Sequence, residues 1–120
     1  MIATYKTRRT FEKYDDEHYL LYLNEQEVKA TEPETNETFD GYSYDGDMCD
    51  GSTKIETNDI TDDNKRSKFI AGLIGCKYSL DAQIAILANG NDTPEHAAEL
   101  EAFTDYRASC KTAIDALLAR

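Results

Sequence analysis

The chain of 120 residues is poor in cysteine and has no long hydrophobic segment. Its three cysteines, Cys49, Cys76 and Cys110, are odd in number and widely spaced, which is typical of reduced thiols in a cytosol rather than of a disulfide framework. No apolar run approaches the roughly 18–20 residues that span a bilayer. The basic N-terminal segment is not followed by an apolar core, so the sequence predicts neither a membrane span nor a secretory signal.

Positive charge is scarce as well. The chain carries 13 Lys and Arg against 24 Asp and Glu, which gives a formal net charge of -11. A generic nucleic-acid-binding protein needs a basic face to neutralise phosphates, and an anionic membrane surface would repel this chain. We therefore expect no direct nucleic-acid partner and no membrane partner. The two basic clusters, Lys6-Arg8-Arg9 and Lys65-Arg66-Lys68, are interpreted as solvated faces or as a patch that docks on an acidic neighbour.

The two halves of the chain differ in pattern, which predicts an α+β fold within a single domain of residues 1–120. Residues 1–58 are acidic and rich in tyrosine, and their short alternating segments favour a small antiparallel sheet of short strands. Residues 61–120 have helical periodicity and predict three helices, the last one long. We expect the apolar stripes of these helices to cover one face of the sheet.

Short strands are predicted for residues 3–13, 18–23 and 53–57, with a return strand that begins at Val28. Residues 31–40 are predicted to form a solvated loop. Asp-Gly pairs supply the positive φ that tight turns need, so we expect three hairpin turns at the pairs Asp40-Gly41, Asp45-Gly46 and Asp50-Gly51.

Helix starts and stops are well marked in the second half. Thr61 is the predicted N-cap of the first helix. Ser79 is the predicted cap of the second, whose stripe of Leu80, Ile84 and Leu87 we assign to the core, with Gly90 as its stop. The segment Thr93-Pro94-Glu95 opens the third helix, because a cap, a proline at the first helical position and an acid follow one another. Its apolar stripe runs to the C-terminus.

The end of this last helix is the predicted interaction site. Leu117 and Leu118 are adjacent and face about 100° apart on a helix, so one core can hardly bury both. We therefore predict that Ile114, Leu117 and Leu118 extend beyond the domain and bind a protein partner or a second copy of the chain.

The sequence contains no strong candidate for a catalytic or metal-binding site. A calcium loop that begins with Asp45 and Asp47 and ends with Glu56 would have Asp50 at the sixth position, where the sharp turn needs glycine. No cysteine–histidine spacing suggests zinc, and neither a nucleophile elbow nor a phosphate-binding glycine loop occurs. We predict no catalytic residue, no metal site and no cofactor, and hence a protein that is not an enzyme.

Three segments of the chain resemble a group of small phage and prophage proteins of gut anaerobes. They are GYSYDGDMCDGSTKI, RSKFIAGLIGCKYSLDAQIAILANG and AFTDYRASCK, which together cover about residues 40–112. The last segment also resembles the C-terminal helix of phage tail-fibre assembly and tail accessory proteins. The chain departs from the group at Cys49-Asp50, where a Pro-Asp turn is usual. The resemblance implies a role near the phage tail or in virion assembly, and no functional residue.

Two functions lead at this point, ahead of a small enzyme or metal binder as the third possibility. The first is a non-enzymatic protein–protein interaction protein, with a phage tail or virion assembly accessory as the role that the resemblance implies, located in the host cytoplasm or on the virion. The alternative is an acidic DNA-mimic inhibitor of a nucleic-acid-binding host protein. Its acids would come from residues 31–50, which hold seven acids and no Lys or Arg.

Overall fold

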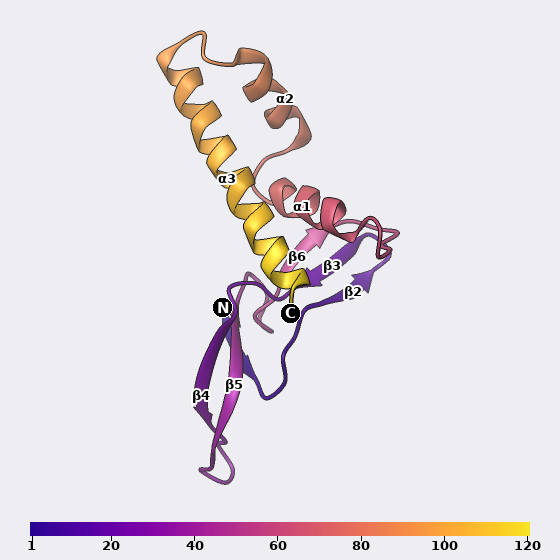
Figure 1. The fold of residues 1–120 in the computed structure, drawn as a ribbon, viewed down its shortest axis with the longest axis vertical. Coiled ribbons are helices and arrows are strands. Elements are labelled where there is room, and N and C mark those ends of the chain that lie inside the picture. The colour runs from indigo at the N-terminus through magenta and orange to yellow at the C-terminus, as the bar shows by residue number, and fades with distance from the viewer.

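The computed structural model describes residues 1–120 and has an α+β fold, as predicted (Figure 1). Six strands precede three helices: β1 (Ile2–Tyr5), β2 (Phe11–Asp15), β3 (His18–Leu21), β4 (Gln26–Thr31), β5 (Thr38–Asp45), β6 (Thr53–Glu56), α1 (Lys65–Gly75), α2 (Leu80–Asn89) and α3 (Pro94–Leu118). The strands form two antiparallel sheets in place of the single sheet expected, with the orders β1-β5-β4 and β2-β3-β6.

The β1-β5-β4 sheet contains the longest hairpin of the chain. Thr31 pairs with Thr38 at its tip, so residues 38–40 belong to a strand and are not the end of a solvated loop. The predicted strand over residues 3–13 is divided in two, because β1 pairs with β5 whereas β2 pairs with β3 of the other sheet. The chain crosses from one sheet to the other between these two strands.

The Asp-Gly pairs play different structural parts. Gly51 has a φ of 82° and turns the chain before β6, as predicted. Gly41 lies within β5 instead of in a turn, and a Cβ atom there would lie 2.7 Å from the backbone oxygen of Tyr5 in the neighbouring strand. Glycine at position 41 is therefore needed for the close approach of β1 to β5.

Two of the three helix starts are confirmed. The side chain of Ser79 accepts a hydrogen bond from the backbone N–H of Ala82 at 3.1 Å, and the side chain of Thr93 accepts one from His96 at 3.1 Å. Helix α1 begins after Asn64 and not after Thr61. The backbone N–H of Thr61 donates to Asn64 Oδ1 at 2.8 Å, which closes a turn before the helix.

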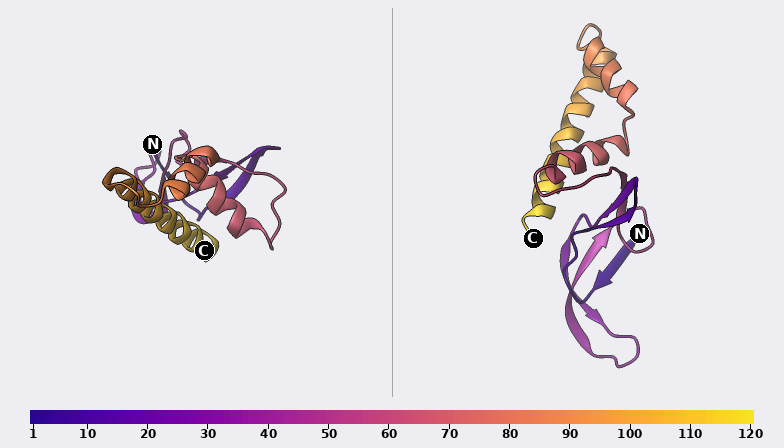
Figure 2. Two further views of the ribbon diagram at one scale, coloured as in Figure 1. Left: turned by 90° about the horizontal axis from the view of Figure 1, so that it is seen from above. Right: turned by 90° about the vertical axis from the view of Figure 1, so that its right-hand side faces the viewer.

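The hydrophobic core lies between α1, the C-terminal half of α3 and the β2-β3-β6 sheet. Phe69 of α1 is fully buried, with its ring 4.9 Å from that of Phe11 and 5.7 Å from that of Tyr19 (centroid to centroid). The right-hand view of Figure 2 shows α1 and the end of α3 against the body of the molecule, while α2 and the start of α3 extend away from it. The helices cover one sheet, as expected, but α2 takes no part in covering it.

The molecule is elongated, with principal extents of 61 × 32 × 23 Å. The β4–β5 hairpin projects at one end and the α2–α3 hairpin at the other (Figure 1). No single helix is both long and apolar enough to cross a bilayer, although the bent pair of α1 and α2, which meet at 84°, would reach the length and composition of a span together.

Two glycines of α1 provide a matched test of this packing. A Cβ atom on Gly72 would lie 2.9 Å from Ile55 Cδ1 and 3.1 Å from the Glu56 backbone oxygen, whereas nothing lies within 4 Å of one on Gly75. We expect Gly72→Ala to lower the free energy of unfolding by about 1–2 kcal/mol through overpacking against β6. Gly75→Ala should raise it by about 0.5 kcal/mol through helix propensity. Urea denaturation of both variants checks this, and equal effects would contradict the close contact of α1 with β6.

Candidate interaction site

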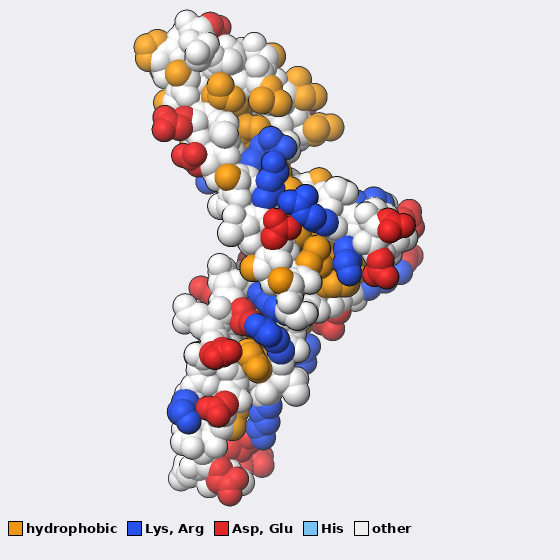
Figure 3. Space-filling view, viewed as in Figure 1, with side chains coloured by type: hydrophobic (Ala, Val, Ile, Leu, Met, Phe, Trp, Pro, Cys, Tyr) orange, Lys and Arg blue, Asp and Glu red, His pale blue; other side chains and the backbone are white.

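The outer face of α2 is the main exposed hydrophobic surface of the helical region. Leu80, Ile84 and Leu87 are 72%, 57% and 60% exposed and lie on one stripe of the helix, because they are spaced by four and three residues. In Figure 3, hydrophobic side chains gather over α2 at the upper end of the molecule. Isolated exposed apolar residues are common, but a stripe of three large ones on a short helix is typical of an interaction site.

The predicted orientation of α2 was wrong. The stripe assigned to the core faces away from the molecule, and Ile86 is the buried residue of the helix. Across from α3, the small residues Ala82 and Ala85 line a hollow together with Glu99 and Ala102. Since α2 is apolar on nearly all sides, periodicity alone could not decide which face turns inward. That lack of a polar face is the sequence signal that could have revealed the site, because a helix of this kind needs cover on every side.

The predicted interaction residues at the chain end lie elsewhere than expected. Ile114 and Leu117 are fully buried in the core, and Leu118 is partly buried and packs against it. The end of α3 therefore does not extend beyond the domain. Leu117 and Leu118 can both find cover because this end is enclosed by α1 on one side and by the connections between the two sheets on the other (Figure 1). Partner binding itself stays a prediction.

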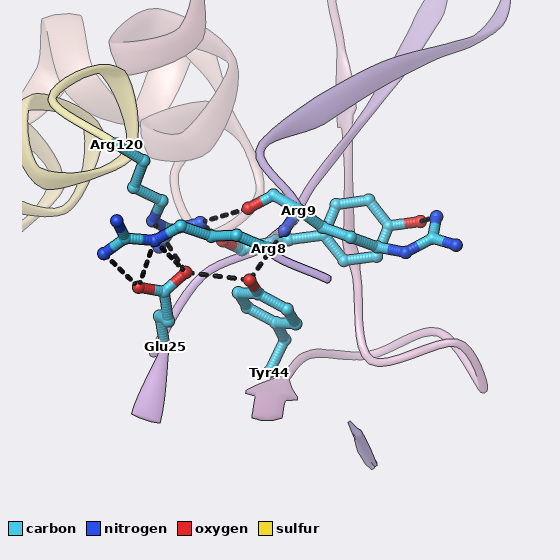
Figure 4. Close-up of polar contacts among 6 residues, drawn as sticks. Arg8, Arg9, Glu25, Tyr44 and Arg120 are labelled. Carbon is cyan, nitrogen blue, oxygen red and sulfur yellow. Dashed lines mark hydrogen bonds and ion pairs between the residues drawn. The ribbon is translucent and has the colours of Figure 1, made fainter. Parts of the chain in front are cut away.

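The last residue of the chain anchors this end. The side chain of Arg120 is only 6% exposed, and its Nη1 donates hydrogen bonds to the backbone oxygens of Arg9, at 3.0 Å, and of Tyr22. Its Nε lies 3.3 Å from Glu25 Oε2. Burial lowers the pKa of Arg120 from its ordinary value, and the carboxylate of Glu25 opposes that effect. Figure 4 shows Arg120 beside Glu25 and the backbone oxygen of Arg9, with Arg8 and Tyr44 bonded to the same carboxylate.

Glu25 lies at the centre of a polar cluster with Arg8, Arg9, Tyr44 and Arg120, which we call the junction. Its carboxylate accepts hydrogen bonds from Arg8 Nη2 at 2.7 Å and Arg8 Nε at 3.0 Å, and from the Tyr44 hydroxyl at 2.8 Å. Burial acts to raise the pKa of Glu25, but the hydrogen bonds from Arg8 and Tyr44 and the charge of Arg120 outweigh it and lower that pKa. The Tyr44 hydroxyl also accepts the backbone N–H of Arg9 at 2.8 Å. The arrangement links both sheets to the end of α3.

A second group of tyrosines and acids continues the junction. The Tyr22 hydroxyl lies 2.9 Å from Glu12 Oε1 and 3.1 Å from Asp50 Oδ2, and burial raises its pKa. The guanidinium of Arg9 lies 4.1 Å from the centroid of the Tyr5 ring, a favourable cation–π distance. The first basic cluster is thus divided: Arg8 and Arg9 serve the junction, and Lys6 pairs with Glu32.

The second basic cluster borders an open groove of about 1060 Å³ that follows α1. Five cationic side chains line this groove: Lys54, Arg66, Lys68, Arg107 and Lys111. Arg66 is paired with Asp115 at 2.7 Å, and Lys68 Nζ donates to the backbone oxygen of Asn58 at 2.8 Å. Leu80 also lines the groove, so positive charge adjoins the first turn of the α2 stripe.

The acidic segment 31–50 is distributed over a hairpin and is partly neutralised. Glu32 pairs with Lys6 at 2.7 Å, Asp40 with Lys29 at 3.2 Å, and Asp45 with the N-terminal ammonium at 3.3 Å. No observation brings the acids of this segment together on one unpaired face, so the DNA-mimic alternative stays a prediction.

Candidate metal ligands and nucleophiles are not brought together into a site. No group of three or more His, Cys, Asp or Glu side chains is placed to hold a metal ion, and Asp47 Oδ1 instead accepts the backbone N–H of Lys54 at 3.2 Å. Partial desolvation of the Cys76 thiol and burial of the Cys110 thiol raise the pKa of each, the opposite of what a thiolate nucleophile requires. The expectations of no metal, no cofactor and no enzymatic activity stay predictions.

In comparisons with known proteins, no family model matches the chain, and no significant match is found among curated proteins or solved structures. The resemblance to phage proteins is therefore untested and stays a prediction.

The Glu25 junction predicts a specific effect on stability. We expect Glu25→Gln to lower the free energy of unfolding at neutral pH by about 3 kcal/mol, because it leaves the buried Arg120 without its counter-charge. The exposed Glu27, two residues along in β4, is the matched control, and Glu27→Gln should change stability by less than about 0.5 kcal/mol. Denaturant unfolding of both variants checks this. Similar small losses in the two would mean that the junction contributes little.

The same carboxylate predicts how stability depends on pH. The pKa of Glu25 is lowered in the folded protein, so its contribution is fully present above the unfolded-state pKa of about 4.3 and is lost as pH falls through the folded value. Acid titration of stability should therefore be steeper for the parent than for Glu25→Gln below that pH. Parallel curves would refute the assignment.

The cysteines predict an order of reactivity. The three thiols are free, with Cys49 and Cys76 exposed and Cys110 buried, as expected for Cys110. Labelling of the native protein with a thiol reagent should modify Cys49 first and Cys110 only at the rate of unfolding, because its side chain lies within the core. Fast labelling of Cys110 would contradict the packing of α3 on α1.

Proposed function

We propose that this chain is a non-enzymatic protein–protein interaction protein that docks its partner on the outer face of α2. The observation that carries the proposal is the exposed stripe of Leu80, Ile84 and Leu87 on a helix covered only on its α3 side. Burying three such side chains in a partner would supply most of the driving force, at about 1.5–3 kcal/mol for each residue.

The rest of the molecule suits this role. The end of α3 is fixed in the core by Ile114 and Leu117 and by the junction at Arg120, whereas the α2–α3 hairpin stands clear of both sheets (Figure 1). The chain thus presents a short apolar helix on a helical hairpin that projects from the body of the molecule. The phage resemblance supports an accessory role in tail or virion assembly, in the host cytoplasm or on the virion.

Site-specific photo-crosslinking tests the proposal. A benzophenone amino acid is introduced at Ile84, and the matched control carries it at Thr104, which is exposed on α3. We expect a discrete crosslinked product from position 84 in cells that express the chain in its native genetic setting, and none from position 104. Identification of that product by mass spectrometry also tests the assembly role, since a virion protein or a second copy is expected. Equal or absent crosslinking at the two positions would refute docking through α2.

A further inference from the structure

The α2–α3 hairpin has a basic end and an acidic end. Near the start of α2, the ring of Tyr78 packs on those of Phe103 and Tyr106, with centroids 5.0 and 5.6 Å apart. This contact sets Lys77 and Arg107 beside the start of α2, and Lys77 Nζ lies 4.8 Å from the centroid of the Tyr106 ring. In Figure 3, Lys and Arg side chains gather below the hydrophobic side chains of α2.

The opposite end of the hairpin is acidic. Residues 90–99 contain no Lys or Arg, and their acids are Asp92, Glu95 and Glu99, with the Asp92 carboxylate hydrogen-bonded to Nδ1 of His96. The backbone N–H of Asp92 donates to the Asn89 oxygen at 3.4 Å, so Asp92 lies directly beyond the end of α2. Glu99 borders the hollow between α2 and α3. The apolar stripe of α2 therefore has Lys77 and Arg107 near one end, where Asp81 also lies, and the carboxylates of Asp92 and Glu95 near the other.

We propose that the occupant of the α2 face is the same face of a second copy, packed antiparallel across a two-fold axis. This inference rests on the docking role of α2 proposed above. Antiparallel packing places Ile84 near the axis and Leu80 of one copy against Leu87 of the other. Lys77 lies just before α2 and Asp92 just beyond its end, so this packing brings each Lys77 toward the partner's Asp92. Parallel packing would instead place like charges together.

The resulting assembly is a four-helix arrangement of two hairpins. A helix of ten residues is about 15 Å long, so the shared face is small and the dimer is weaker than one with a standard interface of about 1,600 Å². The net charge of -11 on each copy also opposes association. The expected behaviour is a monomer–dimer equilibrium that depends on protein concentration.

Sedimentation equilibrium on the intact chain tests the arrangement. Ile84→Glu should weaken dimerisation by about a hundredfold or more, because the side chain is buried twice in each dimer. Thr104→Glu adds the same charge on exposed α3 surface and should leave dimerisation unchanged. Far-UV circular dichroism confirms that both variants are folded, which is expected because both positions are exposed.

A charge exchange tests the antiparallel direction. Lys77→Glu should weaken the dimer about threefold or more, because it replaces two attractive contacts by repulsive ones. The double variant Lys77→Glu/Asp92→Lys restores opposite charges at both contacts and should recover the parent's association. A double variant no tighter than Lys77→Glu would overturn the antiparallel packing.

The outcomes also separate this inference from the proposed function. A parent chain that stays monomeric at every concentration, while position 84 crosslinks to a different protein in cells, overturns self-association and leaves docking through α2 intact. A monomeric parent with no crosslink overturns both.

Discussion

The ion-paired carboxylate of Glu25 is the contact on which the arrangement of the molecule depends. It receives Arg8 from the connection between the two sheets, Tyr44 from β5 and Arg120 from the end of α3. A largely buried carboxylate is costly unless its cationic and hydrogen-bonding partners are in place. The junction therefore favours one relative position of the two sheets and α3. Hydrogen bonds from Arg120 to backbone oxygens of two other segments add to that constraint. The small sheets, neither of which could cover a core alone, are thereby held as one body.

Because of this anchoring, the two halves of α3 have different surroundings. Its C-terminal half is enclosed by α1 and the junction and supplies Cys110, Ile114 and Leu117 to the core. Its N-terminal half carries only α2, which returns along it at the far end of the molecule (Figure 1). A two-helix unit has one interface, and α2 is apolar on more sides than that interface can cover. The exposed stripe of Leu80, Ile84 and Leu87 follows from this mismatch.

Much of the local structure was predictable from short-range chemistry. Ser79 and Thr93 have hydroxyls that satisfy free N–H groups at helix starts, and Pro94 and Gly90 suit a first helical position and a stop, so those boundaries were placed correctly. Asp-Gly pairs were less informative. The lack of a side chain on Gly41 serves close approach to Tyr5 within a sheet, and a sequence does not distinguish that use from a turn. Because Gly41 was read as a turn and not as part of β5, the division of the first half into two sheets was not predicted.

The sequence by itself determined the α+β class, the long last helix and the burial of Cys110, because periodicity and capping are local properties of the chain. Only the tertiary structure decided which face of α2 is covered and where the end of α3 lies. Those outcomes depend on contacts between residues far apart in the sequence, such as Arg120 with Glu25 and Tyr78 with Phe103. An apolar stripe in the sequence indicates a surface that is favourable to bury, but only the fold determines whether the chain itself buries it.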